Sequence, residues 1–285
     1  MPTIRPIKRI ITGTETEDGA GVRLTRVVGQ GDTHDFDPFL MLDAFDSTNP
    51  DEYTRGFPWH PHRGIETITY LIAGDIEHGD SLGNKGSIKD GDCQWMTAGS
   101  GIIHQEMPVA RERLFGAQIW LNLPAKYKMV MPKYGDIRHE NIPVVDENGS
   151  TVHVVAGAYK GTKGAFIGEY VAATYLDVTL LANALWQIDI PPEMTAFAYI
   201  FTGGAKFSDS EALISAKHAV LFDEGDVIHV SAGATGVRFI LLFAMPLHEP
   251  IAWGGPIVMN TSSELSQSFR ELDEGTFLAH NTLVD

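Results

Sequence analysis

Glycine and proline interrupt this chain so often that it has little room for long helices. The 285 residues include 29 glycines and 15 prolines, which separate many short apolar or alternating segments. Segments such as 65–72, 115–121 and 238–244 are rich in Ile, Val, Thr, Tyr and Phe and are bounded by Gly, Asp or Asn, a pattern typical of β-strands. We therefore expect a mainly β protein.

One short helix is expected near the C-terminus, over 262–274. Thr261 and Glu264 have the spacing of a capping box, in which each residue satisfies a backbone N–H of the other. Leu265, Phe269 and Leu272 follow at i, i+4 and i+7, which places them on one helical face.

Two sequence matches indicate an internal duplication. The Gly-Asp and Ala-Gly pairs within 91–99 recur within 225–233, and 70–74 resembles 199–203, so both matches lie about 130 residues apart. Gly-Asp turns also recur by chance in β proteins, which leaves coincidence as the alternative. A polar, turn-rich segment at 133–152 would separate the two copies.

These observations predict two β domains, 1–135 and 136–285, with the C-terminal helix in the second. A β domain of this size, built from short antiparallel strands, would be a sandwich or a small barrel with room for a ligand.

Charge and cysteine content exclude several classes of protein. Lys and Arg number 21 against 37 Asp and Glu, and the formal charge of −16 argues against direct nucleic-acid binding and against anionic membranes. No apolar run approaches the roughly 18 residues of a membrane helix. The single cysteine, Cys93, permits no internal disulfide. We therefore expect a soluble, cytoplasmic protein.

Two histidine-containing pairs in the first half have the spacing of ligands on β-strands. His60 and His62 are separated by one residue, as are His104 and Glu106. Residues i and i+2 of a strand point to the same face, so each pair could direct two ligands into one cavity. Three imidazoles and one carboxylate bind first-row divalent metals and leave coordination positions open for a substrate or O₂.

The donor types leave the metal open, since Fe, Mn, Co, Ni, Cu and Zn all accept such a set. Glu66 has the same strand parity as His62, but four residues span about 13 Å along a straight strand, so Glu66 reaches the same ion only if the chain bends. The predicted repeat places no comparable ligands in the second half, which indicates one metal ion per chain.

The segments 57–67 and 94–108, which contain these pairs, closely resemble the pirin family of the cupin superfamily. The stretch Phe57-Pro58-Trp59-His60-Pro61-His62-Arg63-Gly64 and the stretch from Gln94 through His104 to Pro108 carry the similarity, and 37–43 and 249–261 extend it over nearly the whole chain.

This resemblance implies two tandem cupin β-barrels of the double-stranded β-helix, or jelly-roll, type. It also implies iron in the N-terminal barrel, held by His60, His62, His104 and Glu106. Many cupins instead use a glutamate that corresponds to Glu66, and we adopt the pirin assignment of Glu106.

The resemblance further implies a quercetin 2,3-dioxygenase type of activity, in which O₂ opens the heterocycle of a flavonol and carbon monoxide is released. Glu106 would then be the candidate base for the flavonol hydroxyl proton. The alternative is an iron-dependent regulatory protein of the transcriptional coregulator type, acting through protein partners. A third reading is another cupin reaction, such as sugar isomerisation.

Overall fold

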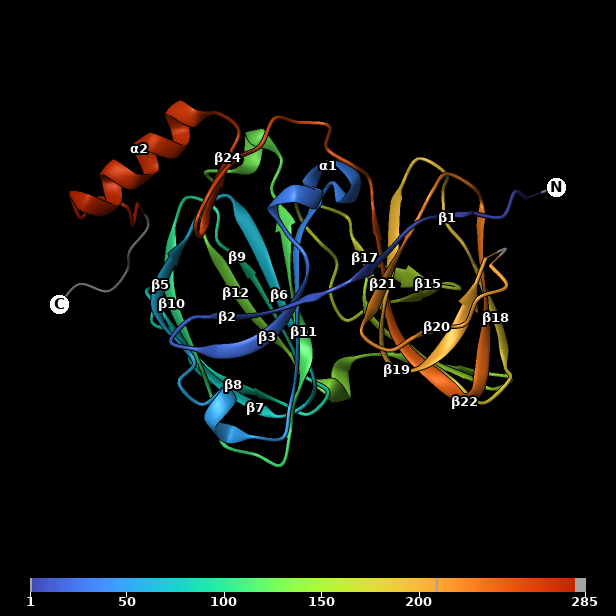
Figure 1. Ribbon diagram of the computed structural model, residues 1–285. Helices are drawn as coiled ribbons and strands as arrows, with labels where there is room; N and C mark the ends of the chain where they lie inside the picture. Colours follow the sequence, from blue (N-terminus) through green and yellow to red (C-terminus); the bar gives the residue numbers. More distant parts are fainter. Residues whose placement is uncertain (1, 209, 280–285) are drawn as a thin grey trace. The chain divides into compact units, whose positions relative to one another are not determined.

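The computed structural model describes residues 2–208 and 210–279, and it divides into two compact units. The unit that we call the first barrel comprises residues 14–33, 39–139 and the chain from 247 onward. The unit that we call the second barrel comprises the chain up to 13 together with 34–38 and 140–246. The predicted mainly β fold with two barrels and one short C-terminal helix is confirmed (Figure 1).

The first barrel is built from two sheets. Its larger sheet has the strand order β12-β9-β6-β11-β4-β3-β2, with bounds β2 (Thr14–Asp18), β3 (Val22–Val28), β4 (Phe39–Ser47), β6 (Ile65–Ala73), β9 (Cys93–Thr97), β11 (Leu114–Asn122) and β12 (Lys133–Ile137). Its smaller sheet has the order β5-β10-β7-β8, with bounds β5 (Phe57–His62), β7 (Asp75–Asp80), β8 (Lys85–Lys89) and β10 (Ile102–Pro108).

The second barrel is built from one sheet, whose two longest strands, β19 (Thr195–Phe207) and β22 (Val227–Ala244), pair with each other. The order is β1-β21-β19-β22-β17-β14-β13, while β18 pairs with β22 and β20 pairs with β19. The bounds are β1 (Ile7–Thr12), β13 (Val144–Glu147), β14 (Ser150–Ala156), β17 (Thr174–Leu180), β18 (Leu185–Asp189), β19 (Thr195–Phe207), β20 (Ile214–Ser215), β21 (His218–Phe222) and β22 (Val227–Ala244). A further hairpin joins β15 (Ala158–Tyr159) and β16 (Thr162–Lys163).

The two barrels share one topology, as a duplication predicts. The central order β6-β11-β4-β3-β2 of the first barrel matches β19-β22-β17-β14-β13 of the second. Tyr70 and Tyr199 occupy equivalent strands, β6 and β19. The Gly-Asp turns are not equivalent, because Asp92 precedes β9 whereas Asp226 precedes β22, and the counterpart of β9 beside β19 is β21. Only one of the two sequence matches therefore lies on corresponding strands.

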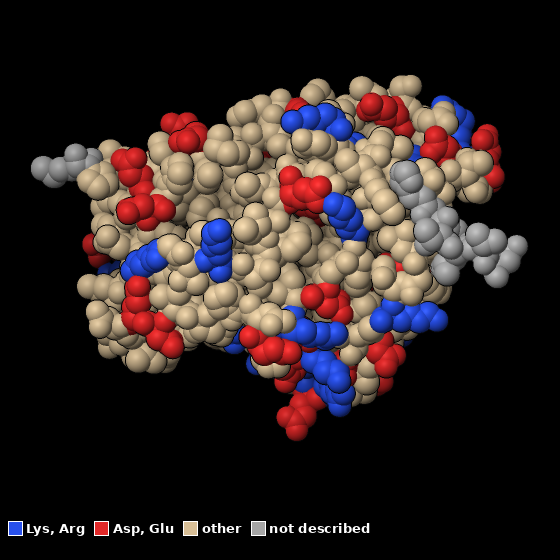
Figure 2. Space-filling view, turned by 180° about the vertical axis from the view of Figure 1, so that it is seen from behind, with Lys and Arg blue, Asp and Glu red and all other residues tan. Residues whose placement is uncertain are grey.

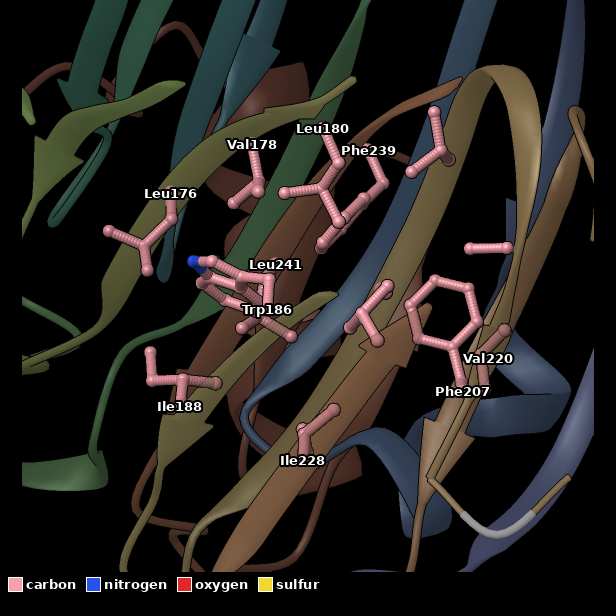
Figure 3. Packing of buried hydrophobic residues seen from close by; sticks show 14 of the residues in the cluster. Leu176, Val178, Leu180, Trp186, Ile188, Phe207, Val220, Ile228, Phe239 and Leu241 are labelled. Carbon is pink, nitrogen blue, oxygen red and sulfur yellow. The ribbon is translucent and has the colours of Figure 1, made fainter. Parts of the chain in front are cut away.

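The interior of the second barrel is filled with apolar side chains. Trp186 and Ile188 on β18 pair with Val230 and Ile228 on β22, and all four belong to the apolar core. Figure 3 labels Trp186, Ile188 and Ile228 in this core. By strand order β18 and this part of β22 correspond to β5 and β10 of the first barrel, which carry the predicted ligands. The second barrel thus places core residues where the first places histidines.

The helix α2 (Ser262–Asp273) has the predicted capping box. The Thr261 hydroxyl accepts from Glu264 N at 3.2 Å, and Thr261 N donates to the Glu264 carboxylate at 2.8 Å. The other helical segments are single turns: η1 (Gln30–Asp32), α1 (Thr33–Phe36), η2 (Pro50–Glu52), η3 (Ala125–Tyr127) and η4 (His139–Asn141).

The division into units differs from the ranges 1–135 and 136–285 at both ends of the chain. Strand β1 pairs with β21, so the N-terminal residues complete the sheet of the second barrel. The C-terminal segment contributes the hairpin β23 (Ala252–Gly254) and β24 (Ile257–Met259) together with α2 to the first barrel. Their apolar side chains form a small core with Phe277.

In the part of the chain that the structure describes, every helix is too short to cross a membrane. On the face shown in Figure 2, acidic and basic side chains are interspersed, and no large basic area is visible.

Candidate metal centre

Strands β5 and β10 bring the two predicted ligand pairs together. They are antiparallel neighbours in which His104 lies opposite His60 and Ile102 lies opposite His62. A register shift between His104 and Glu106 sets Glu106 opposite Phe57. Strand β5 is an edge strand, which explains how it accommodates the two prolines of the Phe57–His62 segment.

The three histidine side chains converge on one point. Their ligand atoms all lie within 4.8 Å of one another, and His60 Nε2 lies 3.1 Å from His62 Nε2. The ring centroid of His104 lies 4.4 Å from that of His60 and 5.0 Å from that of His62. His62 and His104 are buried, and His60 is partly exposed.

Backbone carbonyls fix which nitrogens point inward. His60 Nδ1 lies 2.8 Å from Pro58 O, and His62 Nδ1 lies 3.1 Å from Pro256 O. A carbonyl accepts only, so each Nδ1 carries the hydrogen and each Nε2 presents a lone pair. Two lone pairs 3.1 Å apart repel each other unless a cation lies between them, so this donor set fits a metal ion.

Burial favours the neutral form of His62 and His104. It lowers the pKa of His62 to about 3, with a further contribution from His60. It also lowers the pKa of His104 well below its usual range, assisted by His62 and His60. Both ring nitrogens of His104 are buried without a hydrogen-bond partner among the described residues, and such groups are costly to leave unpaired. Neutral imidazoles with free lone pairs are the form that binds metals.

Glu106 lies at the same cavity but outside the three-histidine group. Gln118 Nε2 donates to both of its carboxylate oxygens at 3.0 Å, and the Thr69 hydroxyl donates at 3.1 Å. These contacts hold a buried carboxylate beside the histidines. The assignment of Glu106 as fourth ligand and base therefore stays a prediction.

Other residues near the motifs have different surroundings. Glu66 is buried on β6, where it accepts from the Thr97 hydroxyl at 2.7 Å, and it is not part of the histidine group. Among the flanking residues, Trp95 and Met96 are buried on β9, whereas Trp59 is 52% exposed. None of the three lines the cavity.

A cavity of about 560 Å³ leads to the candidate centre. Its lining includes exposed residues such as Asp18 and Pro58, so it opens to solvent. Trp120 and Trp253 form an aromatic wall with ring centroids 5.7 Å apart, and Trp120 packs edge to face against His62. The remaining apolar lining comes from Leu24, Met41, Phe45 and Phe57.

The C-terminal hairpin supplies part of this site, and no local sequence pattern links it to the histidines. Pro256 and Trp253 lie nearly 200 residues after the histidines of β5, and only the fold brings them together. Arg63, next to His62, anchors this segment because its guanidinium contacts Ser268, Glu271 and Phe277. Gln118 could have been noticed from its place in the 115–121 strand segment, whose alternation would direct it to one face.

A second group of potential ligands comprises Asp92, His139 and Glu140. Asp92 already accepts from Arg138 at 2.9 Å and from His139 N at 2.8 Å. His139 and Glu140 are exposed. The Asp92 carboxylate is thus already engaged by Arg138 and His139.

Known proteins of similar sequence match nearly the whole chain. Residues 21–121 match the family model described as Pirin, and residues 175–278 match the one described as Pirin C-terminal cupin domain. A pirin-like protein of Caulobacter vibrioides is 41% identical over 280 residues, covering 97% of this chain and 100% of that protein. A Pseudomonas aeruginosa protein that carries a provisional quercetin 2,3-dioxygenase name is 41% identical over 284 residues, covering 96% and 99%.

Solved structures show the same fold. A quercetin 2,3-dioxygenase from Acinetobacter baumannii superimposes with a TM-score of 0.87 at 30% identity, over 96% of this chain and 98% of that one. The nickel(II) complex of the pirin YhhW from Escherichia coli superimposes with a TM-score of 0.64 at 21% identity, over 86% and 99%.

Proposed function

This chain belongs to the pirin family, and we propose that it is a metal-dependent dioxygenase of the quercetin 2,3-dioxygenase type. One observation carries the proposal: three imidazoles converge beside a solvent-connected cavity of about 560 Å³ that is lined by His60, His62 and aromatic side chains. The dioxygenase names of relatives and of structural neighbours support this reaction class.

We propose that His60, His62 and His104 hold one divalent metal ion, with Glu106 as the fourth ligand. A bound metal would act as a Lewis acid and template for an ionised flavonol hydroxyl. The family resemblance favours iron, while the donor types would also accept other first-row ions, and the Escherichia coli pirin YhhW was solved in complex with nickel(II).

The chain's own residues would bind and orient the substrate. A planar aromatic molecule fits against the wall formed by Trp120 and Trp253, with one end directed at the histidines. Glu106 then faces that end and can accept the hydroxyl proton on its carboxylate, which Gln118 and Thr69 hold in position.

The alternative is an iron-dependent regulatory protein that acts through protein partners. A sealed metal site beneath an ordered surface would favour that role. The cavity instead reaches solvent at Asp18 and Pro58, which supports access by a small molecule.

Oxygen uptake on addition of quercetin tests the proposal. Protein loaded separately with Fe(II), Mn(II), Co(II), Ni(II) or Cu(II) is compared with His104→Ala treated in the same way. We expect uptake with carbon monoxide release for at least one metal, and none for the variant. No uptake by protein that contains metal would refute the dioxygenase proposal and favour the regulatory alternative.

The variant Glu106→Gln separates the two roles proposed for Glu106. A residue that acts only as base should leave metal content unchanged while turnover falls by roughly 100-fold or more. A ligand that also acts as base should lower both. Full metal content with full turnover would exclude Glu106 from either role.

A further inference from the structure

A row of polar side chains crosses the cavity wall from the candidate centre to its far end. Gln118 on β11 lies opposite Asp43 on β4, and Asp43 lies opposite Arg26 on β3. Residues in register on neighbouring strands direct their side chains to the same face. All three line the cavity, where most other lining side chains of these strands are apolar.

The far end of this row is a rigid charged fork. Arg26 Nε donates to Asp43 Oδ1 at 2.9 Å and Arg26 Nη2 donates to Asp43 Oδ2 at 2.7 Å, while Asp18 Oδ2 accepts from Nη2 at 2.8 Å. The Asp43 side chain is 5% exposed, whereas the Arg26 side chain is 36% exposed. The Nη1 group of Arg26 has no hydrogen-bond partner among the described residues, so its donors remain available.

The separation of the two ends sets the size of a ligand that could reach both. Neighbouring strands lie about 4.8 Å apart, so Arg26 lies roughly 10 Å along the row from Gln118. Gln118 contacts both oxygens of Glu106, which places it at the metal end. A molecule with two or three joined aromatic rings spans such a distance.

Resting on the proposed function, we propose that Arg26 and Asp18 form a specificity site that binds a neutral hydroxyl group at the end of the substrate remote from the metal. A hydroxyl both donates and accepts, so it can accept from Arg26 Nη1 and donate to the Asp18 carboxylate. Arg26, Asp18 and Asp43 together carry a net charge of −1, which disfavours a carboxylate in that place. An ammonium has no acceptor for Arg26 Nη1, whereas a neutral hydroxyl satisfies both Arg26 and Asp18.

Three probes of one scaffold test this inference by calorimetric binding to metal-loaded protein. Quercetin carries hydroxyls at its remote ends, 3-hydroxyflavone carries none, and 3-hydroxyflavone with a 4′-carboxylate carries a charge instead. We expect quercetin to bind the wild type at least about tenfold more tightly than either analogue. The variants Asp18→Asn and Arg26→Lys should reduce this advantage to roughly threefold or less without weakening 3-hydroxyflavone. Arg26→Lys keeps a cation beside the buried Asp43, so the fold is retained.

Two control variants leave this site intact. The first control is Arg23→Gln: the Arg23 side chain lies on the same strand as Arg26 but is 61% exposed and pairs with Glu17 and Glu52. The second is Arg238→Lys, which alters a similar arginine–aspartate pair with Asp177 in the second barrel. Both should bind the three probes as the wild type does. Equal binding of quercetin and 3-hydroxyflavone by the wild type, or an advantage that persists in both test variants, overturns the specificity site alone. Absence of binding by every flavonol overturns the proposed function with it.

Discussion

Replacing Arg63 by Met tests how the C-terminal segment is held against the candidate centre. The Arg63 side chain is 2% exposed. Its Nε donates to Ser100 O at 2.7 Å, its Nη1 donates to Glu271 at 2.6 Å, and its Nη2 donates to Phe277 O at 2.8 Å. The guanidinium also lies 4.2 Å from the centre of the Phe277 ring. Methionine retains most of the apolar stem and removes every one of these donors.

The expected loss follows from the groups left behind. The buried carbonyls of Ser100 and Phe277 lose charged donors, at about 1–2 kcal/mol each. Loss of the cation–π contact adds about 1 kcal/mol. Glu271 is 24% exposed and can be rehydrated, so the ion pair contributes less than the upper range for a buried pair. We expect a destabilisation of about 3–5 kcal/mol, or roughly 6–20 °C in the unfolding midpoint.

Hydrogen exchange and denaturant unfolding measure this effect, with a double-mutant cycle that uses Glu271→Gln. Amides of α2 should lose protection in Arg63→Met while those of β17 and β22 keep theirs, because the latter strands belong to the second barrel. Removing Glu271 as well should add little to the loss. Arg23→Gln, which disrupts an exposed ion pair, should change stability by less than about 1 kcal/mol.

Stability within about 1 kcal/mol of the wild type and unchanged protection of α2 would refute the reasoning. That result would mean that the apolar contacts of β24 and α2 hold the segment without Arg63.

Four further predictions concern other residues. Burial raises the pKa of the Cys93 thiol. A thiol reagent should therefore label the native protein only as fast as the structure around Cys93 transiently unfolds, and stoichiometric labelling within seconds would contradict this. Thr261→Ala removes the cap of α2 and should cost about 1 kcal/mol in denaturant unfolding. Burial lowers the pKa of Lys128 to about 7. Between about pH 7 and 10.5 the unfolded chain therefore binds a proton that the folded state lacks, so the free energy of unfolding should rise by up to about 1.4 kcal/mol per pH unit. Lys128→Met should abolish this rise. A chelator should lower the unfolding temperature of metal-loaded wild type and leave His104→Ala unchanged.

Local signals in the sequence were sufficient for the strand segments within β6, β11 and β22, for α2 and for the grouping of the histidines. Alternation places His60 and His62 on one face of β5, and the capping-box spacing locates the start of α2. These features depend on neighbours within a few residues, where strand parity and hydrogen-bond reach leave few choices.

The contacts that complete the site come from parts of the chain far apart in sequence. Nothing near His62 indicates that Pro256 would accept its Nδ1 hydrogen, or that Arg63 would meet Glu271. The ligand status of Glu106 depends similarly on Gln118 and Thr69 from two other strands. Such partners follow from sheet order and register, which local patterns do not specify.

The two barrels show what this site costs in stability. At the strands where the second barrel buries Trp186, Ile188, Ile228 and Val230, the first barrel carries imidazoles whose lone pairs face one another. Burial of unpaired polar groups opposes folding, and a bound cation would offset that cost by pairing them. Lys128 supplies a donor to the hairpin at this end, with Nζ bonded to Val258 O at 2.9 Å, and Arg63 donates to Glu271 of α2 at 2.6 Å. The first barrel thus places buried polar groups beside its C-terminal segment at these strands, where the second barrel has an apolar interior.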